Sequence, residues 1–312
     1  MDAPCVALFG SNGFIGKEIL PSFLDALQER ALSSLKLATQ NPRSSAYDAA
    51  RNRGAIVCLI NFGDKPSLRR MLEDVDVVVS CMGTGGDYKE NKKILVEACA
   101  EANVKVYVPS EWGTDHRHIS YQHPMFTSKQ DHQSYAQSLG LKTIAIYTGL
   151  IMETSFCKWF GFDTKNRTWN IVGSGERPVA MTSQKDLGPL TLRTILLAFS
   201  SPESCPSQLR VYSDNRSIQE YRKCFENESK EQLRTNFTSL QDAERDYESK
   251  KASIPPNLLG PLMNLLIADG SLDHSSNARE IINPGQYYFR WTTVDDYARE
   301  VGGLPWENES PW

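Results

Sequence analysis

The first sixteen residues constrain the fold most, because a short apolar run leads directly into three regularly spaced glycines. Residues 6–9 (Val-Ala-Leu-Phe) are typical of a central parallel strand. The glycine spacing that follows permits a tight turn, a close approach of the backbone to a pyrophosphate and close packing of the next helix. We therefore predict a dinucleotide site, with the phosphates at the positive N-terminus of a helix over about 14–29. The residues expected around the phosphates are Gly10, Ser11, Asn12, Gly13, Phe14, Ile15 and Gly16.

Strand-like and helix-like segments alternate through the first half of the chain. Such alternation predicts an α/β fold of Rossmann type, with a doubly wound parallel sheet. Strands are expected over 6–9, 35–39, 55–60, 75–80, 104–108 and 143–147, and helices over about 14–29, 45–53, 66–73, 88–102 and 126–138.

The pattern loosens after about residue 150, which indicates a smaller, interleaved second domain. We expect residues 1–152 to form the nucleotide-binding domain, joined by segments from about 185–215, and residues 153–312 to be mainly substrate-binding. Within the second part we expect a hairpin or loop at 173–176, a helix over 185–199 and a charged, solvated helical region at 218–250. The apolar segment 258–269 could line a pocket or belong to ordinary core.

Composition and charge exclude several classes of protein. The hydrophobic content of 40% and charged content of 23% are ordinary for a soluble globular protein. A net charge of -4 gives no electrostatic footprint for nucleic acid or an anionic membrane, and no apolar run approaches the roughly 20 residues of a membrane span. The sheet edges carry no clear dimer signal, so a monomer and a homodimer both remain open.

Cysteine and histidine usage bears on compartment and metal binding. The seven cysteines are scattered, without metal-ligand spacing, and are expected to be buried free thiols of a reducing compartment. Because the first strand starts by residue 5, leaving no room for a signal peptide, we expect a cytoplasmic protein. The histidines follow no recognised ligand pattern and those in the polar loop should be solvated, so no metal is predicted. They are His116, His118, His123 and His132.

The loop after the second strand indicates which dinucleotide is bound. An acidic residue there would hydrogen-bond the ribose hydroxyls of NAD, whereas cationic and small polar residues accept a 2′-phosphate. Residues 37–45 contain no carboxylate, and Arg43 is followed by two serines. We expect NADP(H), although an exposed loop arginine without a ligand is the alternative. The contacts are expected from Thr39, Gln40, Asn41 and Arg43.

Three further segments carry a family resemblance. They are Val75–Ser80 with Gly83, the stretch Pro109-Ser110-Glu111-Trp112-Gly113-Thr114-Asp115, and Phe126-Thr127-Ser128-Lys129. With the opening glycines, they resemble the NmrA-like and isoflavone reductase-like group of atypical short-chain dehydrogenases. Residues 172–175 and 185–188 also resemble elements of that group. Two departures are visible: Gln40 stands where members often have arginine, and the segment between Asp115 and Lys129 is shorter than in the plant reductases.

The resemblance implies a role for Lys129, which would contact the nicotinamide ribose and act as proton donor or acceptor. A surface helix lysine is the alternative. The short-chain dehydrogenase pattern Tyr-x-x-x-Lys occurs only at Tyr247 and Lys251, far from the cofactor region, and is interpreted as chance. The nicotinamide end of the cofactor should be bordered by Met82, Gly83, Pro109, Ser110 and Glu111. A substrate wall, or alternatively plain core, is expected from Trp112, Tyr147, Met152, Phe156 and Trp159.

Two functions from different classes follow. The first is an NADPH-dependent reductase that transfers a hydride to a small, aromatic or conjugated molecule at a C=C, C=O, C=N or benzylic carbon, with Lys129 as general acid or base. The second is a regulator that binds NADP(H) without turnover and acts through a protein partner. Lys129 discriminates between them, because a pure sensor has little use for it.

Overall fold

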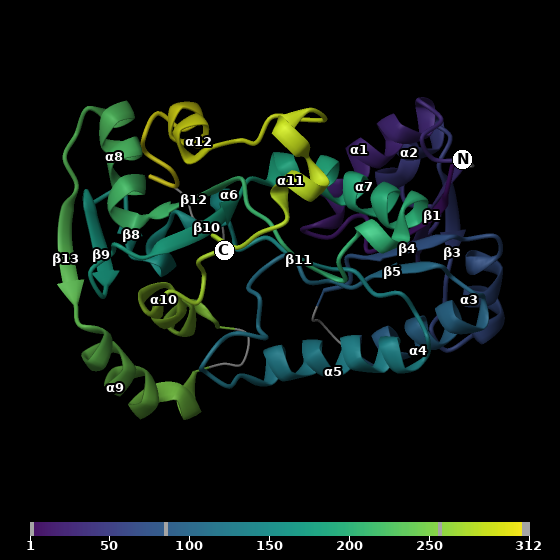
Figure 1. Cartoon of the computed structure of the whole chain (residues 1–312), viewed down its shortest axis with the longest axis horizontal. Helices are drawn as coiled ribbons and strands as arrows, with labels where there is room; N and C mark the ends of the chain where they lie inside the picture. The colour runs from purple at the N-terminus through teal and green to yellow at the C-terminus, as the bar shows by residue number, and fades with distance from the viewer. Residues whose placement is uncertain (1–2, 84–86, 255–257, 308–312) are drawn as a thin grey trace.

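A five-stranded parallel sheet forms the centre of the first half of the chain (Figure 1). The computed structural model describes residues 3–83, 87–254 and 258–307. The strands run in the order β3-β2-β1-β4-β5, so the chain winds outward from β1 in both directions and the predicted doubly wound sheet is confirmed. They are β1 (Cys5–Phe9), β2 (Ser34–Thr39), β3 (Ile56–Leu59), β4 (Val77–Ser80) and β5 (Val106–Val108).

The sheet is extended past β5 by a later segment. Tyr107 forms a parallel bridge with Thr143, after which the chain enters β6 (Ala145–Tyr147). Strand β6 pairs in parallel with β11 (Gln208–Arg210). The C-terminal ends of β1, β4, β5 and β6 therefore follow one another along one edge, which is where such folds bind ligands.

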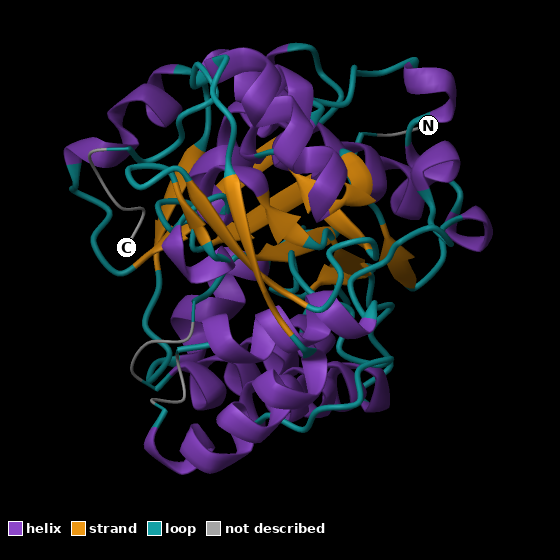
Figure 2. Ribbon diagram, turned by 90° about the vertical axis from the view of Figure 1, so that its left-hand side faces the viewer, coloured by secondary structure: helices purple, strands orange, loops and turns teal. Residues whose placement is uncertain are grey.

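Helices cover both faces of this sheet. Val6 and Leu8 of β1 pack into one core with α1 and α7, whereas Ala7 and Phe9 pack into another with α3, α4 and α5. Figure 1 shows α1, α2 and α7 above the sheet with α3, α4 and α5 below it, and Figure 2 shows the strands between helical layers. The helices are α1 (Gly16–Gln28), α2 (Asp48–Asn52), α3 (Lys65–Leu72), α4 (Tyr88–Glu101), α5 (Pro124–Ser138) and α7 (Gln184–Ser200).

A second hydrophobic core lies among two three-stranded sheets and the later helices. One sheet has the order β12-β10-β7 and the other the order β13-β9-β8. The strands are β7 (Leu150–Ile151), β8 (Phe162–Asp163), β9 (Thr168–Val172), β10 (Pro178–Thr182), β12 (Asp214–Ser217) and β13 (Arg234–Thr238). The helices are α6 (Met152–Ser155), α8 (Ile218–Ser229), α9 (Leu240–Lys250), α10 (Gly260–Asp269) and α12 (Val294–Glu300), whereas α11 (Arg279–Ile282) packs on the first core.

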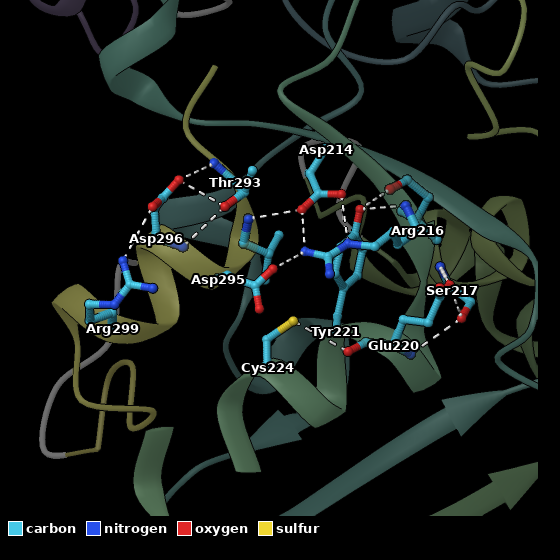
Figure 3. A network of polar contacts seen from close by, with 12 residues as sticks. Asp214, Arg216, Ser217, Glu220, Tyr221, Cys224, Thr293, Asp295, Asp296 and Arg299 are labelled. Carbon is cyan, nitrogen blue, oxygen red and sulfur yellow. Dashed lines mark hydrogen bonds and ion pairs between the residues drawn. The ribbon is translucent and has the colours of Figure 1, made fainter. Parts of the chain in front are cut away.

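A polar network joins β12, α8 and α12 in this second part (Figure 3). The Arg216 guanidinium donates to Asp214 of its own strand and to Asp295 of α12, at 2.8 Å each. Asp214 also accepts from the backbone N–H of Val294 at 2.9 Å, and the Tyr221 hydroxyl donates to the Val179 carbonyl at 2.8 Å. These contacts tie the consecutive elements β12 and α8 to α12 and β10, which are distant from them in sequence.

Later segments also return to the first core. Leu187 of α7, Leu209 of β11, Ile282 of α11 and Trp291 all pack into the core beside β1. Residues 278–291 therefore contribute to the first core, as α7 and β11 do, and the two parts of the chain are interleaved.

Several expected elements differ in the structure. The region 218–250 is interrupted by β13, which pairs in parallel with β9, so the expectation of a helical region is wrong there. Residues 173–176 form a loop and not a hairpin, because β9 and β10 belong to different sheets. The first helix begins at Gly16, since residues 10–15 are used by the turn.

The cysteines are all free. Six are buried as expected, but Cys58 is half-buried because β3 lies at the sheet edge. Within the described ranges, no helix combines the length and the apolar character needed to cross a bilayer.

Candidate functional site

The glycine turn after β1 has a geometry that larger residues could not adopt. Gly10 has a φ of +76°, and a Cβ there would lie 2.7 Å from the Cys81 carbonyl oxygen. A Cβ on Gly16 would lie 2.1 Å from the Gly10 carbonyl oxygen, to which the Gly13 N–H donates at 2.9 Å. The turn is thus pressed against β4 on one side and α1 on the other. Its tip, residues 12–14, is exposed.

Ser11 lies in this turn with a buried hydroxyl. The residue is 1% exposed, and among the described residues its hydroxyl has no hydrogen-bond partner. A buried hydroxyl without a partner costs free energy, and a phosphate oxygen at the start of α1 would supply the missing acceptor. The turn therefore fits the pyrophosphate of a dinucleotide.

The loop after β2 presents a free cation. The Asn41 N–H donates to the Thr39 hydroxyl at 3.1 Å, and Arg51 donates to the carbonyls of Pro42 and Ser44, which fixes the loop. Arg43 between them is exposed and forms no ion pair within the described part of the chain. Gln40 is exposed beside it. This arrangement leaves the Arg43 guanidinium available to an anion.

The next two strands end beside the glycine turn. Met82 after β4 is half-buried and Gly83 is exposed, whereas Pro109 after β5 is buried and Ser110 half-buried. Since β4 pairs with both β1 and β5, these residues lie along the same edge as the turn. A dinucleotide bound at the turn and extending along this edge would pass these residues.

Lys129 is held at the end of β5 by α5. The helix begins at Pro124, where the His123 ring accepts from the Met125 N–H at 3.2 Å and caps the first turn. The Lys129 ammonium then donates to the carbonyl oxygens of Ser110 at 3.0 Å and Glu111 at 3.2 Å. It also donates to Oε2 of Glu111 at 3.2 Å. The lysine is therefore a fixed group and not a solvated surface lysine.

Glu111 is the buried counterion of this lysine. Besides Lys129, its carboxylate accepts from His116 Nε2 at 3.1 Å and from Gln133 Nε2 at 2.9 Å. Burial by itself would raise the pKa of Glu111, but the Lys129 charge and the hydrogen bonds from His116 and Gln133 outweigh it and lower the pKa to about 2. Glu111 is therefore an anion at neutral pH.

Tyr147 belongs to the shell behind this ion pair and not to a substrate wall. Its hydroxyl donates to Gln208 at 2.8 Å and accepts from Gln133 at 3.1 Å, and the residue is fully buried. The His116 ring packs edge-on against Tyr147 and is stacked with Phe126. The expectation that His116 is solvated is wrong, because the ring is 3% exposed and bonded to Glu111.

Two large cavities meet at Lys129. One, of about 580 Å³, runs from the glycine turn towards α10, and the other, of about 820 Å³, lies between α4 and α5. Glu111, Met125 and Lys129 line both. The smaller cavity has a mainly apolar wall that includes Phe14, Trp112, Phe126, Leu150, Ile151, Trp159, Leu259 and Met263.

The expected substrate wall is only partly correct. Trp112 and Trp159 line the smaller cavity. Met152 and Phe156 are completely buried in the second core and line neither cavity; the Phe156 ring packs against Phe225 at a centroid distance of 4.7 Å. The segment 258–269 was expected either to line a pocket or to belong to the core, and it does both. Some of its residues line the smaller cavity, and others, such as Leu266, are buried in the second core.

Sequence reasoning missed Gln133, His116 and Lys92. Gln133 lies four residues after Lys129 and thus on the same face of α5, a spacing that could have identified it. Of the two residues of the Tyr-x-x-x-Lys pattern, Lys251 lines the larger cavity and Tyr247 does not. Within the described residues, no group of histidine, cysteine and acidic side chains could hold a metal ion.

The chain is similar to known proteins. The profile of the NmrA-like family matches residues 3–297. Pinoresinol reductase 2 of Arabidopsis thaliana is 25% identical, over 80% of this chain and 81% of that protein. Isoflavone reductase of Glycine max is 22% identical, over 95% of this chain and 98% of that protein.

Solved structures of low sequence identity have the same fold. The complex of leucoanthocyanidin reductase with NADPH from Vitis vinifera gives a TM-score of 0.75 at 18% identity, covering 95% of this chain and 99% of that one. AtPrR2 with NADP+ and (+)pinoresinol gives 0.73 at 21% identity, covering 96% and 99%. Since the family profile spans the sheet, the ion pair and both cavities, the chain belongs to the NmrA-like family.

Proposed function

We propose that this protein is an NADPH-dependent reductase of a small aromatic or conjugated molecule. The observation that carries the proposal is Lys129, fixed by Glu111 where the glycine-turn edge of the sheet meets an apolar cavity. Three of the four relatives and neighbours named above are reductases by name, and two of the structures hold NADPH or NADP+. Both facts support the proposal.

The chain's own residues suit each part of this cofactor. The N–H groups of the glycine turn and the Ser11 hydroxyl would bind the pyrophosphate, and Arg43 would bind the 2′-phosphate through charge-assisted hydrogen bonds. Met82 to Gly83 and Pro109 to Glu111 would border the nicotinamide end. When bound there, NADPH supplies a hydride to an electron-poor carbon of the substrate.

Lys129 would supply or accept the proton that accompanies this transfer. Its three N–H groups are directed at three protein acceptors, so a substrate oxygen or nitrogen would have to displace one of them. The contact with the Glu111 carbonyl oxygen is the easiest to exchange, because it is longer than that with Ser110 and, unlike the carboxylate contact, involves no charged acceptor. Glu111 would keep the ammonium in place, and His116 and Gln133 would keep the carboxylate in place.

The smaller cavity would hold the reacting part of the substrate. Trp112, Trp159 and Met263 line it. The Trp112 indole N–H donates to the Thr191 hydroxyl at 3.2 Å, and the Trp159 indole N–H to the Thr154 carbonyl at 2.8 Å. With their polar atoms satisfied, the two rings offer flat apolar surfaces that suit a conjugated or aromatic molecule.

Isotope transfer tests this function with a mixture of candidate substrates. The purified protein is incubated with NADPH deuterated at C4 and a metabolite extract, and mass spectrometry detects molecules that gain deuterium. We expect a labelled product with the wild type, and its loss with Lys129→Met, which keeps the length of the side chain. Lys165→Met, on an exposed turn, is the matched control and should retain labelling.

Either part of the proposal can fail in this experiment. Absence of label in spite of NADPH binding would contradict the reductase and favour the non-catalytic NADP(H) sensor. Labelling that persists in Lys129→Met would contradict the general acid-base role of the lysine.

A further inference from the structure

The cavity between α4 and α5 is strongly cationic. Five lysines line it, against two acidic residues, Glu111 and Asp131. Three of the lysines come from the first two turns of α4, whose positive end also faces this region. The lysines are Lys89, Lys92, Lys93, Lys129 and Lys251.

Lys92 is the most unusual member of this group. It is 7% exposed, yet among the described residues its ammonium has neither a hydrogen-bond acceptor nor a carboxylate partner. The ammonium lies over the Tyr88 ring, whose centroid is 5.3 Å from Nζ. Burial, and then the charge of Lys129, lower the pKa of Lys92 to about 8, and the negative charge of Glu111 only partly offsets them. An ammonium at the cavity wall without an acceptor, and with the Lys129 cation near it, favours an anionic ligand.

The acidic side chains do not supply that anion. Glu111 is already bonded to Lys129, His116 and Gln133. Asp131 is exposed on the outer part of the cavity wall. The net field in the cavity therefore favours a negatively charged ligand.

The cationic cavity adjoins the apolar one. Lys129, Glu111 and Met125 form part of both walls, so one molecule could extend past Lys129 from one cavity into the other. The phosphates of the cofactor have other sites, at the glycine turn and at Arg43, so they do not account for these lysines.

We propose that the lysine-lined cavity is an anion subsite of the substrate cavity, and that the substrate combines a conjugated apolar body with a carboxylate or phosphate group. Lys92 binds the anionic group, Lys89 and Lys93 steer it, and the apolar body lies against Trp112 and Trp159. This inference rests on the proposed function, because it assumes that the apolar cavity holds the substrate.

Binding of matched probes tests the subsite. Cinnamate, a conjugated aromatic carboxylate, is compared with cinnamamide, its neutral analogue of nearly the same shape, by calorimetry on the NADP+-loaded protein. We expect cinnamate to bind about tenfold or more tightly than cinnamamide, the factor for one charge-assisted hydrogen bond. Inorganic phosphate should compete with cinnamate. The preference should be lost in Lys92→Met and retained in the control Lys165→Met.

The double variant K89M/K93M provides a second test in case Lys92→Met, at a buried position, does not fold. Both lysines are exposed, and the variant should weaken cinnamate binding while leaving cinnamamide unaffected. Equal binding of cinnamate and cinnamamide, or a preference that survives both variants, would overturn the proposal. Binding of phosphate without cinnamate would also overturn it, since the site would then belong to a free anion.

Failure of this inference is distinguishable from failure of the proposed function. If NADPH transfers its deuterium but carboxylate and amide bind equally, the substrate is not an anion and only the subsite is disproved. If the carboxylate preference holds but no label is transferred, the subsite stands and the reductase is disproved.

Discussion

Glu111 holds the Lys129 ammonium from two sides, with its side-chain Oε2 and its own carbonyl oxygen both 3.2 Å from Nζ. The same residue thus supplies a charge and a backbone dipole to one cation. Because the carboxylate is 1% exposed and bonded on its far side by Gln133, the pair cannot swing towards solvent. The lysine is thereby aimed at the two cavities.

Replacing Glu111 should break its ion pair with Lys129 and destabilise the fold. Glu111→Gln keeps the shape but removes the charge, which leaves the half-buried Lys129 without a counterion. We expect a loss of about 1–3 kcal/mol in the free energy of unfolding at neutral pH, measured by urea denaturation. Glu101→Gln, which breaks an exposed pair with Arg69, should change it by less than about 0.5 kcal/mol. An equal effect of the two variants would contradict the buried ion pair.

Acid should remove the same stabilisation. The pKa of Glu111 is lowered from 4.5 to about 2, so between these values the unfolded chain binds more protons than the folded one. The contribution is fully present above about pH 4.5 and is lost as the pH falls towards 2. Urea midpoints measured through this range should therefore fall more steeply for the wild type than for Glu111→Gln. Parallel curves would show that Glu111 does not carry a lowered pKa.

Lys129 and Glu111 could be found from sequence, but their surroundings could not. Both lie in motifs that resemble a known family, and the strands that carry those motifs are marked by local apolar runs. His116 is brought to Glu111 by the path of a loop, and Gln208 is brought to Tyr147 by the pairing of β11 with β6, which are distant in sequence. Such contacts leave no periodic pattern in the chain.

The second half was harder to predict for a similar reason. Strand β13 is mostly exposed and flanked by charged segments, so its residues resemble those of a solvated helix. It forms a strand because it pairs with the edge of β9. That pairing depends on the tertiary structure and not on the local sequence. Aromatic residues that line a cavity and those that fill a core are likewise indistinguishable until the neighbouring elements are placed.

Phe156 and Trp159 allow these two roles to be separated. Phe156 is completely buried and packs against Phe225 and Tyr297, so Phe156→Ala should lower the free energy of unfolding by about 3–5 kcal/mol. Trp159 is half-buried on a cavity wall, and Trp159→Ala should cost clearly less. Urea denaturation followed by circular dichroism measures both. A greater loss for Trp159→Ala would place it in the core.

The glycine turn should be intolerant of a single methyl group. In Gly16→Ala the new Cβ would meet the Gly10 carbonyl at 2.1 Å, so α1 must move away from the turn. We expect NADPH affinity to fall by about tenfold or more, as measured by quenching of tryptophan fluorescence. Gly63→Ala is the control, because its Cβ would lie 3.4 Å from the Asn61 side chain, an ordinary contact. Unchanged NADPH binding in Gly16→Ala would contradict the assignment of this turn to the cofactor.

Arg43 should decide between the two nicotinamide dinucleotides. Its guanidinium is exposed and forms no ion pair in the described part of the chain, so Arg43→Ala should leave the loop intact. We expect the variant to bind NADPH about tenfold to hundredfold more weakly, the equivalent of one charge-assisted hydrogen bond, with little change in NADH affinity. Arg70→Ala, which removes an exposed arginine on α3, is the control for net charge. Equal losses for NADPH and NADH would mean that Arg43 shapes the loop, because only a contact with the 2′-phosphate can separate the two cofactors.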